Sequence, residues 1–193
     1  KFELTFFAPM PSPGEKMGKR AVEAVGKMFA KLGIGTRYGK KVTGFEAGGT
    51  VLFEDGSKLE SDLTMFIAAG QGHPVVQASG LPKSDAGFVQ TDEGCAVLGL
   101  PGVWAVGDSA ALLGPAWKAK QGHMAEVMAR VAAANVLAAA EGRPERKSYL
   151  PEVSIVCLMD MGRGAAFVRR DDEVEKLVPM PVSMNSRWMS FRR

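Results

Sequence analysis

Val103-Trp104-Ala105-Val106-Gly107-Asp108-Ser109 is the stretch that decides the fold expected of this 193-residue sequence. It begins as an apolar strand expected to be buried, and it ends in Gly-Asp shortly before a long helical pattern at Lys118–Ala140. A strand that leads through glycine towards a helix is typical of α/β sheets, which bind ligands beyond the ends of their strands. There the Asp108 carboxylate can accept hydrogen bonds from sugar hydroxyls, or from water and amides around phosphates. A carboxylate that only caps the turn is the structural alternative.

Upstream of this stretch, the pattern predicts strands, one helix and hairpins. Lys19–Leu32 has the apolar spacing of an amphipathic helix, which Gly33 closes. Leu63–Ala68 is an unbroken apolar run, as expected of a strand covered on both faces. Strands are also expected at Glu3–Ala8, Arg37-Tyr38, Lys41–Glu46, Thr50–Glu54, Lys58–Glu60 and Gly87–Thr91, with Asp55-Gly56 as a hairpin turn.

Downstream, the long helix gives way to β-rich sequence. Gly142-Arg143-Pro144 stops the helical pattern of Lys118–Ala140. Further strands are expected at Val153–Met159, Gly164–Arg169 and Lys176–Pro181, and the basic, Met-rich end Met184–Arg193 has no clear period. The predicted fold class is therefore α/β, with a hairpin excursion into mixed sheet and a β-rich C-terminal piece.

Composition and spacing exclude several classes of protein. Apolar residues make up 46% and charged residues 23%, which is ordinary for a protein with a packed core. The net charge of +3 is too small and too scattered to indicate nucleic-acid binding. Two cysteines cannot build a disulfide scaffold. His73 and His123 are far apart in the sequence, and Cys95 has no partner at metal-ligand spacing. The longest apolar stretches reach about ten residues, whereas a membrane span needs ~20.

Three stretches resemble the two-dinucleotide-domain flavoproteins, in the order in which that family has them. Val103–Ser109 resembles the second motif for flavin adenine dinucleotide (FAD), an apolar strand ending in Ala-x-Gly-Asp. Ser61–Gly70 resembles the Asp–apolar strand–Ala-x-Gly crossover back to the flavin domain, and Gly87–Glu93 resembles the strand Gly-Phe-Val-x-Val-Asp. The resemblance implies a Rossmann-like fold and FAD as cofactor. It implies that the cofactor is bound by Gly107, Asp108 and Gly70.

The sequence around Cys157 carries a second, finer resemblance. Ser154–Phe167 is similar to the redox-cysteine strand of sulfide:quinone oxidoreductases, in which Cys-x-x-Asp-Met-Gly leads to Gly-Ala-Ala-Phe. Lys118–Glu126 resembles the Pro-Lys-Thr-Gly-x-Met-x-Glu turn of the same group, with Ala119 at the proline position. The alternative for Cys157 is a buried, inert thiol in a strand.

These resemblances imply an enzyme that oxidises sulfide and reduces a quinone. Cys157 would carry the sulfur, and Lys120 would lie near the pyrimidine oxygens of the flavin, where a cation stabilises negative charge on the reduced ring. Three alternatives stay open: the flavin subunit of a sulfide dehydrogenase that passes electrons to a cytochrome, a type II NADH:quinone dehydrogenase, and a non-catalytic relative that keeps the fold.

The same resemblance implies that the sequence is the C-terminal half of such an enzyme. The Gly-x-Gly-x-x-Gly motif expected on an opening strand is absent, and the chain opens with Lys1 inside a strand pattern. The implied parts are residues 1–84 from the second nucleotide-binding domain, 85–145 from the FAD domain and a 146–193 redox-cysteine segment. The implied partner is the N-terminal half of the same protein. A homo-oligomer, a peripheral membrane contact through the basic tail, and a cytoplasmic, membrane-peripheral or periplasmic location are left open.

Overall fold

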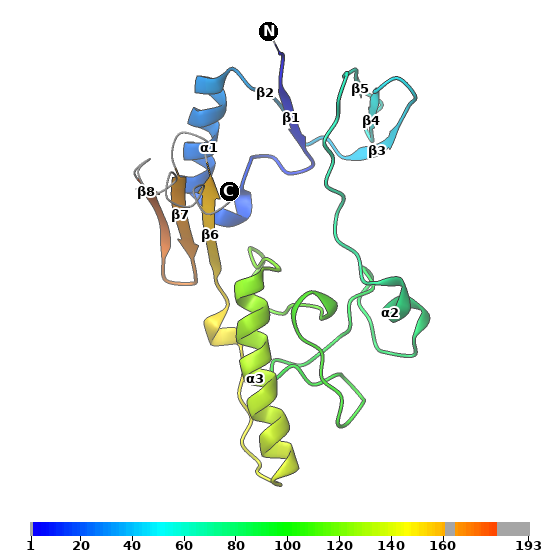
Figure 1. Ribbon diagram of the computed structural model, residues 1–193, viewed down its shortest axis with the longest axis vertical. Helices are drawn as coiled ribbons and strands as arrows, with labels where there is room; N and C mark the ends of the chain where they lie inside the picture. The colour runs from blue at the N-terminus through cyan, green and yellow to red at the C-terminus, as the bar shows by residue number, and fades with distance from the viewer. Residues whose placement is uncertain (1, 161–164, 181–193) are drawn as a thin grey trace, which may run out of the picture. The chain divides into compact units, whose positions relative to one another are not determined.

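The computed structural model describes residues 2–160 and 165–180, and the chain forms two compact units, Lys1–Ala68 and Ala69–Arg193 (Figure 1). Both contain helices and strands. The domain boundaries at residues 84 and 145 stay predictions. Met184–Arg193 and the glycines Gly162 and Gly164 of the cysteine motif lie outside the described residues.

The first unit contains a strand–helix–strand element, as its sequence pattern predicts. Strand β1 (Thr5–Ala8) pairs in parallel with β2 (Gly35–Tyr38), and the short helix η1 (Glu15–Met17) and α1 (Lys19–Leu32) connect them. Helix α1 buries Ala21 and Val25. Its C-terminus is formed by Gly33 in the left-handed conformation, with φ 68°, which a residue without a Cβ adopts most readily.

The predicted hairpins are confirmed in the same unit. Strands β3 (Val42–Phe45), β4 (Val51–Phe53) and β5 (Lys58–Leu59) form an antiparallel sheet whose middle strand buries Val51 and Phe53. At the turn between β4 and β5, hydrogen bonds from Lys40 and Ser57 hold the pKa of the Asp55 carboxyl below its usual range.

The prediction of a buried strand at Leu63–Ala68 is wrong. No strand is assigned there, and the Leu63, Met65 and Ile67 side chains are 85%, 89% and 92% exposed. An apolar run becomes a strand only where a neighbouring strand pairs with its N–H and C=O groups, and none of the described strands pairs with this run. Phe66 is packed better than these three, because its ring contacts the rings of Phe7 and Phe45.

The second unit is built around helix α3 (Gly122–Ala140), the long helix of Figure 1. The hydrophobic core combines one face of this helix with residues from distant segments. Tyr149 is fully buried there, and its hydroxyl accepts a hydrogen bond from the Leu113 N–H at 2.8 Å. The helix begins at Gly122 rather than at Lys118, because Gln121 is still extended, with φ −149° and ψ 156°. Within the described ranges, no helix is both long and apolar enough to cross a membrane.

Two further predicted strands of this unit, Gly87–Thr91 and Val103–Val106, are reduced to isolated bridges. Val89 pairs with Ala110 in parallel, and Trp104 pairs with Ala96 in antiparallel fashion. Val103, expected to be buried, is 40% exposed. These predictions are wrong in the same way as the one at Leu63–Ala68, because the apolar pattern is present without the continuous partner strands that a ladder needs.

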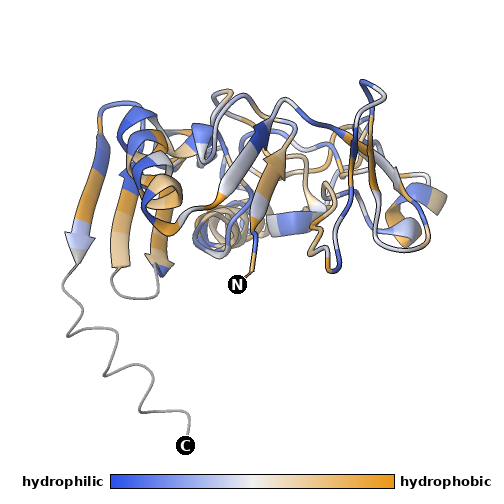
Figure 2. Ribbon diagram, turned by 90° about the horizontal axis from the view of Figure 1, so that it is seen from above, coloured by the Kyte–Doolittle hydropathy of each residue, from blue (hydrophilic) through white to orange (hydrophobic). Residues whose placement is uncertain are grey.

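The β-rich C-terminal piece is confirmed. Short helices α2 (Pro74–Ala78), η2 (Gly107–Ser109) and η3 (Leu150–Glu152) precede an antiparallel sheet of β6 (Ile155–Asp160), β7 (Ala165–Arg170) and β8 (Glu175–Met180). In Figure 2 these three strands are coloured mostly hydrophobic along their middles. Cys157 pairs with Val168 on β7, so its position in the sheet is fixed by regular register.

Candidate cofactor site

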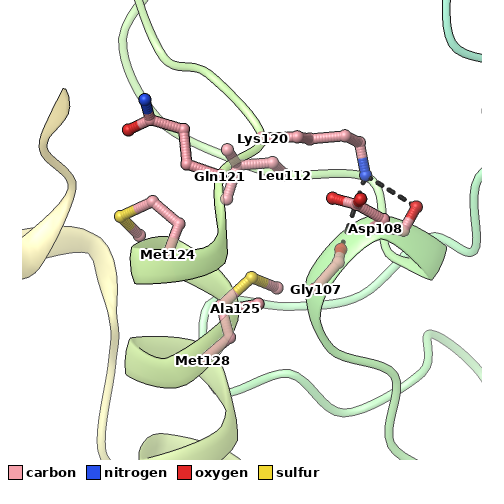
Figure 3. A pocket seen from close by; sticks show the side chains of 8 residues that line it. All are labelled: Gly107, Asp108, Leu112, Lys120, Gln121, Met124, Ala125 and Met128. Atoms are coloured by element: carbon pink, nitrogen blue, oxygen red, sulfur yellow. Dashed lines mark hydrogen bonds between the residues drawn. The ribbon is translucent and has the colours of Figure 1, made fainter. Parts of the chain in front are cut away.

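A shallow pocket lies where η2 meets the start of α3 (Figure 3). It is open to solvent and encloses no cavity in which a small-molecule ligand could be buried. The pocket can therefore contact one part of a large ligand. Its lining residues are Gly107, Asp108, Leu112, Lys120, Gln121, Met124, Ala125 and Met128.

Both the backbone conformation at position 107 and the small distance to α3 require glycine there. Its φ of +62° lies in the left-handed region, which costs a residue with a Cβ ~1–2 kcal/mol. A Cβ at this position would also lie 3.1 Å from the Cβ of Ala125 on α3. The glycine therefore lets η2 turn tightly against the first turns of the helix.

Asp108 presents its carboxylate to solvent at the pocket. The residue is exposed, and no hydrogen bond is formed by its carboxylate oxygens among the described residues. The turn is held instead by Ser109, whose hydroxyl donates to the Val106 carbonyl oxygen at 2.9 Å. The alternative in which Asp108 caps the turn thus has no hydrogen bond to support it, and both carboxylate oxygens can accept from a ligand.

The Lys120 ammonium lies on the same turn rather than in solvent. It donates to the carbonyl oxygens of Asp108 at 3.0 Å and of Gly107 at 3.5 Å (Figure 3). It also donates to the carbonyl oxygen of Ala110. Partial burial lowers the pKa of Lys120, and the nearby Asp108 charge opposes that shift. Lys120 therefore contributes positive charge beside the exposed Asp108 carboxylate.

The N-terminal end of α3 adjoins the pocket with its first-turn N–H groups uncapped by a side chain. Gln121 occupies the capping position, yet its side-chain oxygen accepts from the Val156 N–H at 3.2 Å instead. A helix N-terminus carries partial positive charge and unsatisfied donors, which suit an anion or a polar ring oxygen.

Cys157 is near this end of α3 but does not line the pocket. It is a half-buried free thiol in β6, next to Val156, which binds Gln121. A second link joins the same elements, since His123 Nε2 lies 3.0 Å from Ser154 Oγ. Gly70 is exposed in a segment without helix or strand and lies outside the pocket lining.

Cys95 differs from Cys157 in its burial. It is fully buried against α3, and burial raises the pKa of its thiol to about 11. Such a thiol carries almost no thiolate near neutral pH and is unreactive. Among the residues that the structure describes, no cluster of three metal-binding side chains occurs.

Residues 3–135 match the model of a known family, the pyridine nucleotide-disulphide oxidoreductases. The chain belongs to this family. The matched range includes Gly70, Gly107, Asp108 and Lys120, and it ends before Cys157. Flavin-dependent oxidoreduction is the general class of function that family membership supports. No curated protein matches the chain.

Solved structures of other oxidoreductases share the fold. The sulfide:quinone oxidoreductase of Aquifex aeolicus is 23% identical, with a TM-score of 0.80 over 97% of this chain and 48% of that one. An NAD-dependent persulfide reductase from A. fulgidus is 14% identical, with a TM-score of 0.61 over 89% of this chain and 32% of that one. The water-forming NADH oxidase of Lactobacillus brevis is 14% identical, with a TM-score of 0.62 over 96% and 39%.

These similarities confirm the α/β, Rossmann-like flavoprotein fold. Identities this low show the fold alone. The chain also spans no more than about half the length of these three structures. The substrate and the electron acceptor of the enzyme are therefore proposed below.

The pocket contains residues to which the sequence analysis gave no role in binding the cofactor. Gln121, Met124, Ala125 and Met128 recur at three- and four-residue intervals along one face of α3, which is the spacing of a helix face. That periodicity was available in the sequence. The face of α3 that lies towards η2 is decided by the packing of segments more than ten residues apart in the sequence.

Proposed function

We propose that the chain is the C-terminal part of an FAD-dependent sulfide:quinone oxidoreductase. The observation that carries the proposal is the link between two features of one unit. The pocket of Gly107 and Asp108 lies at the start of α3, and Gln121 joins that start to the strand of Cys157. A cofactor-binding turn and a free thiol are thereby held to the same helix end.

The residues present fit one portion of FAD. Asp108 would accept hydrogen bonds from ribityl hydroxyls or from water around the pyrophosphate, since its carboxylate oxygens are exposed. Gly107 lets the backbone come close to the ligand, and the uncapped start of α3 offers N–H donors and positive charge. When bound, FAD would supply a two-electron acceptor that a quinone can reoxidise. The predicted role of Gly70 in binding FAD stays a prediction.

Cys157 is proposed to carry sulfur. Its thiolate and a hydrosulfide ion would form the S–S bond of a persulfide anion, with release of one proton, and the two electrons would pass to FAD when it is bound. Its free, half-buried state suits this role, whereas buried Cys95 does not. Quinone is the proposed acceptor, and the proposed partner is an N-terminal half of the same protein. The proposed location is cytoplasmic or peripheral to the cytoplasmic membrane.

Anaerobic stopped-flow mixing of the full-length protein with sulfide, and separately with NADH, tests the proposal. We expect sulfide to bleach the flavin absorbance in the wild type. Cys157→Ser should abolish that bleaching and keep the flavin bound, because a hydroxyl is a far poorer nucleophile and cannot carry sulfane sulfur. Cys95→Ala is the matched control and should bleach at the wild-type rate.

Three outcomes would contradict parts of this proposal. Wild-type bleaching in Cys157→Ser removes that residue from the mechanism. Bleaching by NADH but not by sulfide favours the NADH dehydrogenase alternative. A full-length protein without any flavin favours a relative that keeps only the fold.

A further inference from the structure

The Lys120 ammonium also contacts Phe88, which does not line the pocket. Its Nζ lies 4.0 Å from the centroid of the Phe88 ring, within the range of a cation–π interaction. The same ammonium donates to the carbonyl oxygens of Gly107, Asp108 and Ala110. An ammonium has three N–H donors, so three carbonyls engage all of them.

The backbone places Phe88 beside the turn. Val89 donates its N–H to the Ser109 carbonyl at 2.9 Å, and Ala111 donates its N–H to the Val89 carbonyl at 2.7 Å. Phe88 itself is held by Ser84, which accepts from its N–H through the hydroxyl at 3.2 Å and donates to its carbonyl through the backbone at 2.8 Å. The backbone that carries the ring is therefore held beside residues 107–110 by hydrogen bonds.

We propose that Phe88 is a positioning residue of the cofactor site. Its ring holds the Lys120 ammonium on the three carbonyls of the 107–110 turn, and this brace fixes the direction in which Asp108 presents its carboxylate. The inference rests on the proposed function, because the ligand that Asp108 would bind is the flavin. Phe88 needs no contact with the flavin for this role.

Physical chemistry favours an aromatic ring at this position. An aliphatic side chain would cover the ammonium and supply no attraction, so only the carbonyl oxygens and the Asp108 charge would offset the desolvation that lowers the Lys120 pKa. A ring covers the ammonium and attracts it through its negative face. Tyrosine keeps that face, whereas leucine removes it and keeps most of the bulk.

The experiment measures the dissociation constant of FAD for the full-length protein and its variants, after reversible removal of the flavin. We expect Phe88→Leu to weaken FAD binding about threefold to tenfold, and Phe88→Tyr to stay within about twofold of the wild type. In a Lys120→Met background, Phe88→Leu should cause no further loss, because the brace is already gone.

The results that overturn the inference are specific. Equal weakening by Phe88→Leu in both backgrounds means that the ring only packs, and no weakening in the wild-type background means that the ring is dispensable. Equal loss with tyrosine and leucine also excludes the cation–π contact.

A measurement without flavin separates this inference from the proposed function. The ε-protons of selectively labelled Lys120 should show an upfield ring-current shift by NMR in the wild type and in Phe88→Tyr, and not in Phe88→Leu. Absence of the shift in the wild type overturns the brace, whatever the protein binds. If the shift is present and the full-length protein binds no FAD, the proposed function fails and Phe88 has no role as a positioning residue of a flavin site.

Discussion

Asp108 and Ser109 have different roles at the η2 turn. Ser109 closes the turn through its hydroxyl, and Asp108 keeps its carboxylate exposed beside the pocket. An exposed carboxylate contributes little to folding when it makes no hydrogen bond among the described residues. The role proposed for it is therefore in ligand binding rather than in stability.

Replacing Asp108 by alanine in the full-length protein should consequently reduce flavin affinity and leave the fold intact. Hydrogen bonds to a charged acceptor contribute ~1.5–3 kcal/mol, which corresponds to roughly 10- to 100-fold in affinity. Flavin absorbance retained after dialysis measures the effect, and Glu126→Ala, an exposed carboxylate on α3 outside the pocket, serves as the control. Wild-type flavin content in Asp108→Ala would remove this residue from the site.

Cys95 leads to a prediction about pH at the same scale. Its pKa is raised from 9.0 to about 11, so the folded state holds this proton more tightly than the unfolded state. The stabilisation is fully present below pH 9 and is lost as the pH rises through 11, up to about 2–3 kcal/mol. We expect urea unfolding midpoints to fall between pH 9 and 11, and to fall less in Cys95→Ala. The variant comparison is needed because the pKa values of Tyr149 and Lys120 are also shifted, upward and downward. An equal fall in both proteins would contradict the prediction.

At the scale of elements, the contact between η2 and α3 depends on a single missing Cβ. Gly107→Ala places a Cβ in a left-handed conformation and 3.1 Å from Ala125, so it should lower stability by at least ~1–2 kcal/mol. Gly122→Ala is the matched control: this glycine lies at the first position of α3 with no atom within 4 Å of an added Cβ. There alanine should be neutral or stabilising by up to ~1 kcal/mol. Thermal unfolding followed by helical circular dichroism compares the two, and equal midpoints would contradict the proposed packing.

The elements that the sequence predicts well are those whose signals are local. Helix α1 and its closing Gly33 follow from apolar spacing and a left-handed C-terminus, and the hairpin follows from Asp55-Gly56. Leu63–Ala68 and Val103–Val106 were predicted wrongly as buried strands, because a ladder depends on partners that an apolar run does not specify. The family resemblance assigns Gly107, Asp108 and Lys120 to different regions of one cofactor, and the structure places all three in one pocket. Phe88 was not, since its contact with Lys120 bridges thirty-odd residues of sequence and has no local pattern.

At the scale of the whole molecule, one run of exposed apolar residues bears on the proposed partner. Leu63, Met65 and Ile67 expose most of their side chains in one run, and exposed apolar groups gathered in this way commonly mark an interaction site. The Aquifex aeolicus structure shares the fold over 48% of its own length. Both observations support the proposal that an N-terminal half of the same protein completes this chain.

It follows that these 193 residues, expressed by themselves, should bind flavin poorly. The pocket is open to solvent, and its eight lining residues can contact only part of a dinucleotide, so the remaining hydrogen bonds, at ~1 kcal/mol or more each, have no source within it. The purified chain should show little absorbance in the visible flavin bands, and adding the N-terminal half of the protein should restore it. The control is the restored complex carrying Asp108→Ala, which should again lose flavin, because completing the site does not replace the carboxylate. A yellow chain with stoichiometric flavin and no partner would contradict the two-part site, since the pocket would then have to bind the whole cofactor alone.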